Sequence, residues 1–405
     1  MLILADALVS APDRVLRPGR LRVSGRIIQE VGSDLRAQPG EEVLELPGLT
    51  LAPGFLNLHA HLELTPLHGK VAPRLPFAEW LRQILVLLPG LHATARTASI
   101  LETSRSAAES GTTTILTILS DPRSLAGLAG TLPRIWWALE FMDLHGDLQP
   151  AVQMDRLAAW LSRHPGCDWQ AAISPHAPYS ASSDLYRACA DLAKDLRMPF
   201  TTHWAESAEE EELFQKAGGP LRPLLPDGWI PGSLSDRLGA LPSGSLVAHA
   251  NYLSTEHLDL LKARGCFVVH CPTSHAWFGR EPFGLEMFRQ NKLPVILGTD
   301  SPASSDNQSL DLRIEARAFH QAHPEVSWKE IWSMLTTLPA EALGQANRLG
   351  SLTPGAQADW AAWRLPPPNP TPSPLPADPI PAILTSTEPA EVVSIAGRLH
   401  RPEKI

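Results

Sequence analysis

The chain has 405 residues, of which 44% are hydrophobic and 19% charged, as in an ordinary globular protein that is too long for one small core. Its net charge of −9 argues against binding to nucleic acid or to an anionic membrane surface, and no basic cluster is evident along the sequence. The N-terminus lacks a basic leader, no apolar stretch is long enough to cross a bilayer, and four cysteines without Cys-x-x-Cys spacing favour a reducing cytoplasm.

The first 50 residues alternate short apolar runs with turns, which is typical of β-strands. Ser24-Gly25 separates two of these runs and has the composition of a hairpin turn. The expected strands are Met1–Ala7, Arg20–Val23, Arg26–Val31 and Glu42–Leu46.

An apolar run, Leu51-Ala-Pro-Gly-Phe-Leu-Asn-Leu-His-Ala-His61, follows and ends in two histidines. The run is apolar on both faces, as expected of a buried parallel strand. Residues two apart on a strand point to the same side, so His59 and His61 should face one spot, which suits a transition metal. Taken alone, His-x-His is a common accident, and its meaning depends on the rest of the chain.

From residue 51 onward, apolar strands alternate with helical segments such as Ala93–Ser110, Asp184–Leu196 and Thr255–Arg264. Eight such strands over about 300 residues predict a (β/α)₈ TIM barrel. A doubly wound sheet is the alternative, but no Gly-x-Gly-x-x-Gly follows the first strand. The strands expected after His61 are Thr112–Leu119, Ile135–Asp143, Gln170–His176, Phe200–Ser207, Ser245–Asn251, Cys266–Cys271 and Leu293–Asp300.

The C-terminal part returns to β-structure, with expected strands at Trp360–Trp363 and Glu391–Ala396. Between them, the proline-rich segment Leu365–Pro381 should be an extended loop. Because both chain ends resemble strands that flank the barrel, we expect one small β-sandwich domain built from residues 1–50 and 351–405, with the barrel spanning residues 51–350.

Catalytic groups of such barrels lie at the carboxyl ends of the strands, and here six of the eight strands finish with an imidazole or a carboxylate. For each residue alone, a structural role is the better explanation, but that explanation does not account for all of them together. The residues at or just beyond these ends are His59, His61, His176, His203, Glu206, His249, His270, His275 and Asp300.

Four motifs together resemble the amidohydrolase superfamily, and the resemblance covers nearly the whole chain. They are Pro53-Gly-Phe-Leu-Asn-Leu-His-Ala-His61, His203-x-x-Glu206, His249 and Gly298-Thr-Asp300. The branch they resemble is the mononuclear one, which holds adenosine, cytosine, guanine and methylthioadenosine/S-adenosylhomocysteine deaminases and chlorotriazine hydrolases. The resemblance implies that His59, His61, His203 and Asp300 bind one divalent metal ion, zinc in the first place and iron as an alternative.

The same resemblance makes Glu206, His249 and Asp300 the catalytic residues of a hydrolytic deaminase. Three imidazoles and a carboxylate leave one coordination position for water and lower its pKa to about 7. Asp300 would take a proton from that water, Glu206 would protonate a ring nitrogen, and His249 would hydrogen-bond the oxygen being added. The glutamates that follow, within Ser207-Ala-Glu-Glu-Glu-Glu212, are expected on a solvated helix face.

Two other metal-dependent classes are disfavoured. A binuclear site needs a bridging lysine on a middle strand, but between His61 and His203 only Lys70 and Lys194 occur, just after strand one and inside a helix. The cytidine-deaminase type needs His-x-Glu followed by Pro-Cys-x-x-Cys. His61-Leu-Glu63 matches the first part, and the second occurs nowhere.

Four residues are predicted to contact the substrate: His176, His275, Trp277 and Trp80. His176 lies in a His-Ala-Pro-Tyr segment that recurs in methylthioadenosine-type deaminases, although a structural role beside two prolines is nearly as good an explanation. Core packing explains Trp277 equally well. Segment Leu64–Leu88, which contains Trp80, should form a loop and helix over the mouth of the site and select the substrate.

The substrate is expected to be a small molecule, an adenine-type nucleoside such as 6-amino-6-deoxyfutalosine, methylthioadenosine or S-adenosylhomocysteine. The resemblance leaves open a hydrolase of a cyclic amide or of a carbon–halogen bond, and a non-catalytic scaffold that should have lost some ligands. Relatives are often dimers or larger, so a homodimer is possible.

Overall fold

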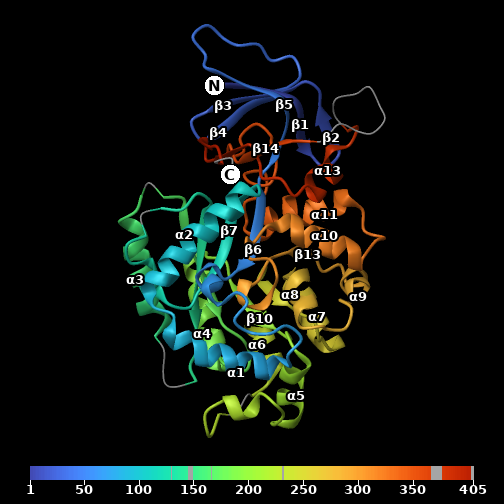
Figure 1. The fold of residues 1–405 in the computed structure, drawn as a ribbon. Helices are drawn as coiled ribbons and strands as arrows, with labels where there is room; N and C mark the ends of the chain where they lie inside the picture. Colours follow the sequence, from blue (N-terminus) through green and yellow to red (C-terminus); the bar gives the residue numbers. More distant parts are fainter. Residues whose placement is uncertain (129, 145–148, 166, 230–231, 366–375, 403–405) are drawn as a thin grey trace.

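The computed structural model describes residues 1–128, 130–144, 149–165, 167–229, 232–365 and 376–402. Strands from both chain ends form one sheet at the top of Figure 1, and a larger part of parallel strands and surrounding helices lies beneath it. The predicted mixture of α-helices and parallel β-strands is therefore confirmed.

The terminal sheet has eight strands in the order β16-β15-β14-β5-β1-β3-β4, with β2 paired to β1. Among the described strands of this sheet, β1 and β5 pair in parallel and the other pairs are antiparallel, with β14 connecting the C-terminal strands to β5. The expectation that both ends of the chain meet in one β-structure is confirmed, whereas its description as a β-sandwich stays a prediction. The strands are β1 (Leu2–Ala11), β2 (Arg14–Leu16), β3 (Gly19–Ser24), β4 (Ile27–Gly32), β5 (Val43–Pro53), β14 (Trp360–Arg364), β15 (Val392–Ile395) and β16 (Arg398–His400).

Two details differ from the expected organisation. The boundary expected between residues 50 and 51 falls inside β5, and the division into domains stays a prediction. The expectation of an extended loop over Leu365–Pro381 is wrong at its end, because α13 (Pro379–Thr385) begins there. Proline is favoured at the first helical position, and the Asp378 carboxylate accepts a hydrogen bond from the Ile380 amide. Residues 366–375 of that loop lie outside the described residues.

The eight strands predicted for the larger part are all present and parallel. They form two four-stranded sheets, β6-β7-β8-β9 and β10-β11-β12-β13. Isolated parallel bridges join the sheets at both edges, Ala60 with Asp300 and Ile173 with Phe200. The strands are β6 (Phe55–Ala60), β7 (Thr112–Leu119), β8 (Arg134–Phe141), β9 (Trp169–Pro175), β10 (Thr201–Trp204), β11 (Leu246–His249), β12 (Phe267–His270) and β13 (Val295–Leu297).

Helices connect these strands and cover them on the outside (Figure 1). The three helices expected from the sequence are α2, α4 and α7, and each agrees with the expected range to within one residue. The α-helices besides α13 are α1 (Phe77–Leu87), α2 (Ala93–Glu109), α3 (Pro150–Ser162), α4 (Ser183–Leu196), α5 (Ala208–Lys216), α6 (Leu234–Ala240), α7 (Thr255–Ala263), α8 (Pro272–Trp277), α9 (Leu285–Gln290), α10 (Leu312–Ala322), α11 (Trp328–Leu335) and α12 (Thr337–Ala342). Short 3₁₀ helices are η1 (Leu62–Leu67), η2 (Leu88–Gly90), η3 (Pro122–Leu125), η4 (Arg222–Leu224) and η5 (Pro302–Ser304).

The parallel strands are buried on both faces. In β7, Leu116 and Ile118 belong to a cluster that also takes side chains from strands of both parallel sheets, such as Leu58 and Val269. Ile115 and Leu119 point the other way, into the layer between strands and helices. This alternation explains why the strands are apolar along their whole length.

Within the described part of the chain, no single helix is long and apolar enough to span a membrane. One bent pair, Phe77–Gly90 with Ala93–Glu109, reaches that length and composition only when both helices are taken together, and it bends by 110°.

Candidate metal centre

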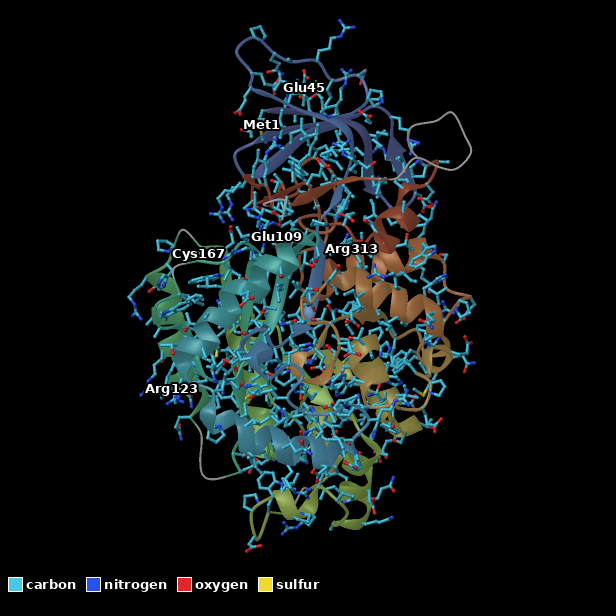
Figure 2. All side chains as sticks on the ribbon, viewed as in Figure 1. Met1, Glu45, Glu109, Arg123, Cys167 and Arg313 are labelled. Atoms are coloured by element: carbon cyan, nitrogen blue, oxygen red, sulfur yellow. The ribbon has the colours of Figure 1, made fainter. Side chains whose placement is uncertain are left out.

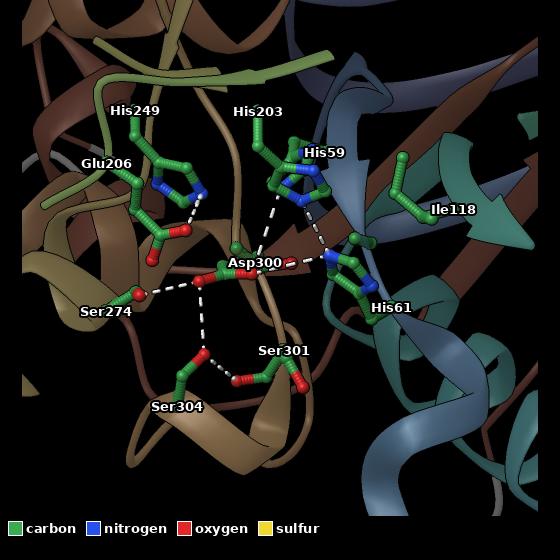
Figure 3. A network of polar contacts seen from close by, with 12 residues as sticks. His59, His61, Ile118, His203, Glu206, His249, Ser274, Asp300, Ser301 and Ser304 are labelled. Carbon is green, nitrogen blue, oxygen red and sulfur yellow. Dashed lines mark hydrogen bonds and ion pairs between the residues drawn. The ribbon is translucent and has the colours of Figure 1, made fainter. Parts of the chain in front are cut away.

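The four predicted ligands meet at the carboxyl ends of the parallel strands (Figure 3). The Nε2 atoms of His59 and His61 lie 3.7 and 3.6 Å from Oδ1 of Asp300. Nε2 of His203 lies 3.3 Å from Nε2 of His61. His59 is on β6, His61 directly follows that strand, His203 is on β10, and Asp300 follows β13.

These distances fit a shared ion better than direct hydrogen bonds. Ligand atoms about 2.1 Å from a tetrahedral ion stand about 3.4 Å from one another. His59 supports the same interpretation, because both of its ring nitrogens are buried without a hydrogen-bond partner among the described residues. A buried imidazole with no partner is costly, and coordination of an ion would use one of its nitrogens.

Two of the histidines and the aspartate are in the protonation state that a metal requires. Burial lowers the pKa of His61 to about 3, and it lowers the pKa of His203 well below the usual value. Burial alone would raise the pKa of Asp300, but the adjacent histidines hold it well below the usual value. At neutral pH the imidazoles of His61 and His203 are therefore neutral and Asp300 is ionised, as metal ligation demands.

Hydrogen bonds from neighbouring groups orient two of these ligands. Nδ1 of His203 donates to the His176 carbonyl oxygen at 3.0 Å, which leaves Nε2 with its lone pair toward the cluster. Oδ2 of Asp300 accepts hydrogen bonds from Ser274 at 2.6 Å and from Ser304 at 3.1 Å, so that Oδ1 faces the histidines. Figure 3 shows both serines on the side of Asp300 away from His61.

Glu206 and His249 stand beside the four-residue cluster. Oε2 of Glu206 lies 3.8 Å from Nε2 of His249, and Oε1 accepts a hydrogen bond from Arg280 at 2.9 Å. Burial raises the pKa of Glu206 to about 7, although the Arg280 charge acts in the opposite direction. A carboxyl with such a pKa can both donate and accept a proton near neutral pH.

Three of the expected strands, those that correspond to β10, β11 and β13, were predicted to extend further at their carboxyl ends than they do. The reason is the backbone conformation. Ala205, His249 and Asp300 have φ values of 47°, 71° and 57°, in the left-handed region that ends a strand. Such strained residues gather at functional sites, where the surrounding structure holds them in place. The turn after β10 thereby brings Glu206 back toward the cluster.

The expectation that all glutamates after Glu206 lie on a solvated face is wrong for Glu210. Its side chain is buried, and its carboxyl oxygens accept hydrogen bonds from the amides of Ala205 and Glu206 at 3.1 and 3.0 Å. Glu210 lies at the third position of α5, after the N-cap Ser207, from where it reaches back over the helix start.

The predicted substrate contacts occupy different surroundings. The ring centroid of His176 lies 4.9 Å from that of His203, beside the cluster. His275 has protein partners on both ring nitrogens, the Asn251 side chain at 3.2 Å and the Glu281 carbonyl at 2.7 Å. Trp277 is buried. The contacts of these three residues with a substrate stay predictions.

Trp80 lies on α1, which is the helix expected over the mouth of the site. Its indole N–H donates to the carbonyl oxygen of Ala303, in the turn that follows Asp300. At the start of the same helix, the Ala78 amide donates to the Glu209 carboxylate. These two contacts tie α1 to the turn after β13 and to α5. A contact of Trp80 with the substrate stays a prediction.

Arg280 and Glu140 were not predicted and lie within this site. Arg280 lies three residues after the end of α8, and its guanidinium carbon is 4.3 Å from the Phe278 ring centroid. Oε1 of Glu140 lies 3.9 Å from Nε2 of His176, and burial raises the pKa of Glu140 to about 8. The position of Glu140 near the end of an expected strand was the available signal, whereas no sequence pattern marked Arg280.

The sequence profile of the amidohydrolase family matches residues 50–399. The chain is similar to 5-methylthioadenosine/S-adenosylhomocysteine deaminase of Pyrococcus furiosus, at 28% identity over 83% of this chain and 79% of that protein. It is also similar to aminodeoxyfutalosine deaminase of Deinococcus radiodurans, at 27% identity over 80% of this chain and 81% of that protein.

The fold resembles that of Helicobacter pylori aminofutalosine deaminase, whose structure contains methylthio-coformycin. The TM-score is 0.82 and the match covers 98% of this chain and 99% of that one. Since the sequence identity is 21%, this match concerns the fold.

Proposed function

The chain belongs to the amidohydrolase family, as its motifs predicted, and on that basis we propose that it is a metal-dependent deaminase of an adenine-type nucleoside. The observation that carries the proposal is that ligand atoms of His59, His61 and Asp300 lie close enough together to share an ion, with Nε2 of His203 3.3 Å from that of His61, beside a separately held carboxyl, Glu206. The names of the two sequence relatives support the substrate class, since both refer to deaminases of adenosine derivatives.

We assign ion binding to His59, His61, His203 and Asp300. Zinc fits this set of nitrogen and oxygen ligands, and iron is the alternative. When bound, such an ion provides an activated water at neutral pH.

The residues around the ion divide the proton transfers between them. Asp300, anchored through Oδ2, accepts the first proton from the attacking water through Oδ1. Glu206, oriented by Arg280, delivers a proton to the ring nitrogen next to the reacting carbon and assists departure of the amine. His249 hydrogen-bonds the incoming oxygen. A carbon–oxygen bond forms, the carbon–nitrogen bond breaks, and the products are a carbonyl compound and ammonia.

We also propose that the two parallel sheets close into a (β/α)₈ barrel and that the terminal sheet folds over its own core as a sandwich. The bridges Ala60–Asp300 and Ile173–Phe200, together with the shared interior cluster, support closure. A reducing cytoplasm is the compartment we propose, since the four cysteines show no Cys-x-x-Cys spacing.

The test is release of ammonia by the metal-loaded protein. The panel contains methylthioadenosine, S-adenosylhomocysteine and 6-amino-6-deoxyfutalosine, with a cyclic amide and a chlorotriazine as competing classes. We expect ammonia from at least one nucleoside and no turnover of the other two compounds. Hydrolysis of the amide or the carbon–halogen bond alone, or protein without stoichiometric metal, would contradict the proposal.

A further inference from the structure

A cavity lies at the opposite ends of the parallel strands from the metal centre. Its volume is about 490 Å³, within the range of small-molecule sites. It is lined by Arg134 at the start of β8, by Asp168 just before β9, and by Arg197 in the loop before β10. Cys167, which precedes Asp168, marks this end in Figure 2, on the side toward the terminal sheet. The cavity is therefore separate from the proposed deaminase site.

The cavity is strongly basic although the chain carries a net charge of −9. Its charged lining residues are four arginines, Arg26, Arg134, Arg197 and Arg348, and one aspartate, Asp168. That aspartate is already shared. It pairs with Arg26, with Arg134 at 3.3 Å, and with Arg398 at 2.7 Å. Arg134 also pairs with the buried Asp359 at 2.9 Å. Two carboxylates therefore stand against five guanidinium groups, which leaves an excess of positive charge around the cavity.

Several polar groups around the cavity lack partners. Nε of Arg134 and Oε1 of Gln357, which also lines the cavity, are buried without hydrogen-bond partners among the described residues. Among the residues that the structure describes, the guanidinium groups of Arg197 and Arg348 have no carboxylate within ion-pair distance. The pKa of Arg26 is lowered, first by burial and then by the charges of Arg134 and Arg398.

We propose that this cavity binds a small molecule that carries an oxyanion group, either a phosphate or a carboxylate. The planar guanidinium fork matches both groups in a bidentate manner, and four arginines around one space offer several such forks. Gln357 adds a hydrogen-bond acceptor, which suits a hydroxyl group next to the anion. This site does not depend on the proposed deaminase activity.

The occupant would bridge the two parts of the fold. Arg26 directly precedes β4 of the terminal sheet, and Gln357 forms a β-bridge with Ile27 of that strand. Arg134, in contrast, begins β8, and Asp168 directly precedes β9. Binding to the folded state alone raises the midpoint of thermal unfolding. A structural effect of the anion is therefore measurable without any assay of activity.

The test is titration calorimetry and thermal unfolding of the full-length, metal-loaded protein with inorganic phosphate and, separately, succinate. Ionic strength is held constant with chloride. The variant R197Q/R348Q removes two exposed, unpaired guanidinium groups and should fold normally. R105Q, at an exposed position on α2, removes a similar charge elsewhere.

We expect saturable binding of one equivalent of phosphate or succinate by the wild type and by R105Q, with a higher unfolding midpoint. R197Q/R348Q should bind at least tenfold more weakly, and the two anions distinguish a phosphate site from a carboxylate site. Absence of saturable binding for both anions would overturn the proposal. Equal affinity in R197Q/R348Q would also overturn it, because the anion would then bind elsewhere, for example at the metal centre.

Discussion

Glu206 is held independently of the predicted ligands, by Arg280 on Oε1, and faces His249 with Oε2. In E206Q the amide keeps the shape of the carboxyl but cannot donate and recover a proton. We therefore expect unchanged metal content and a turnover number at least about 100-fold lower, as for loss of a general acid–base group. Metal analysis and steady-state kinetics measure both quantities. Turnover within about twofold of the wild type would refute the role assigned to Glu206.

Ser274 tests the anchoring of Asp300. Its hydroxyl donates to Oδ2 at 2.6 Å, while Ser304 donates to the same oxygen at 3.1 Å. We expect S274A to weaken metal affinity by about 10- to 100-fold, the usual cost of losing a hydrogen bond to a metal ligand. S304A is the matched control and should weaken it less, because its hydrogen bond is longer. Competition with a chelator gives the affinities, and equal affinities in wild type and S274A would contradict the anchoring role.

The junction between β10 and α5 is the element that positions Glu206. Ser207 caps the helix by accepting a hydrogen bond from the Glu210 amide, and Glu210 in turn accepts from the amides of Ala205 and Glu206. The sequence Ser207-x-x-Glu210 carries this capping pattern. This capping pattern was not recognised in the sequence, because the run of glutamates around it is also typical of a solvated helix face.

Two neighbouring glutamates of α5 allow a controlled test of that junction. In E210Q one side-chain amide must face a backbone N–H, so we expect a loss of about 1–3 kcal/mol in the free energy of unfolding and a lower kcat with intact metal. Glu209 instead holds the start of α1 through the Ala78 amide, and E209Q should leave kcat nearly unchanged and raise KM. Urea unfolding and steady-state kinetics measure these values. Similar kcat values for the two variants would show that Glu210 does not position Glu206.

At the scale of the whole molecule, the features that could be predicted from the sequence are those that a local residue pattern determines. Alternating strands and helices indicated parallel strands, and histidines at strand ends indicated where a metal cluster forms. The arginine cavity could not be predicted in this way, because Arg26, Arg134, Arg197 and Arg348 are far apart in the chain and meet only through the fold. Arg280 was missed for the same reason, since only the tertiary structure places it against Glu206.

The overall pH dependence of stability follows from carboxyls that the fold buries. Burial raises the pKa of Glu140 and of Glu210 to about 8, and that of Glu315 to about 7, from an ordinary value of 4.5. Between pH 4.5 and about pH 8, the folded protein therefore binds more protons than the unfolded chain. Its free energy of unfolding falls as the pH rises through this range. The stabilising contribution is complete below pH 4.5 and is lost as pH rises through 7 to 8.

We therefore expect the urea midpoint of the metal-loaded protein to decrease from pH 6 to pH 9. E140Q should decrease less steeply, because it removes one titrating carboxyl while keeping its shape. The experiment compares both proteins at four pH values and equal ionic strength. A midpoint that stays constant or rises up to pH 9 would mean that these carboxyls are already ionised in the folded protein, each compensated by its hydrogen-bond donors.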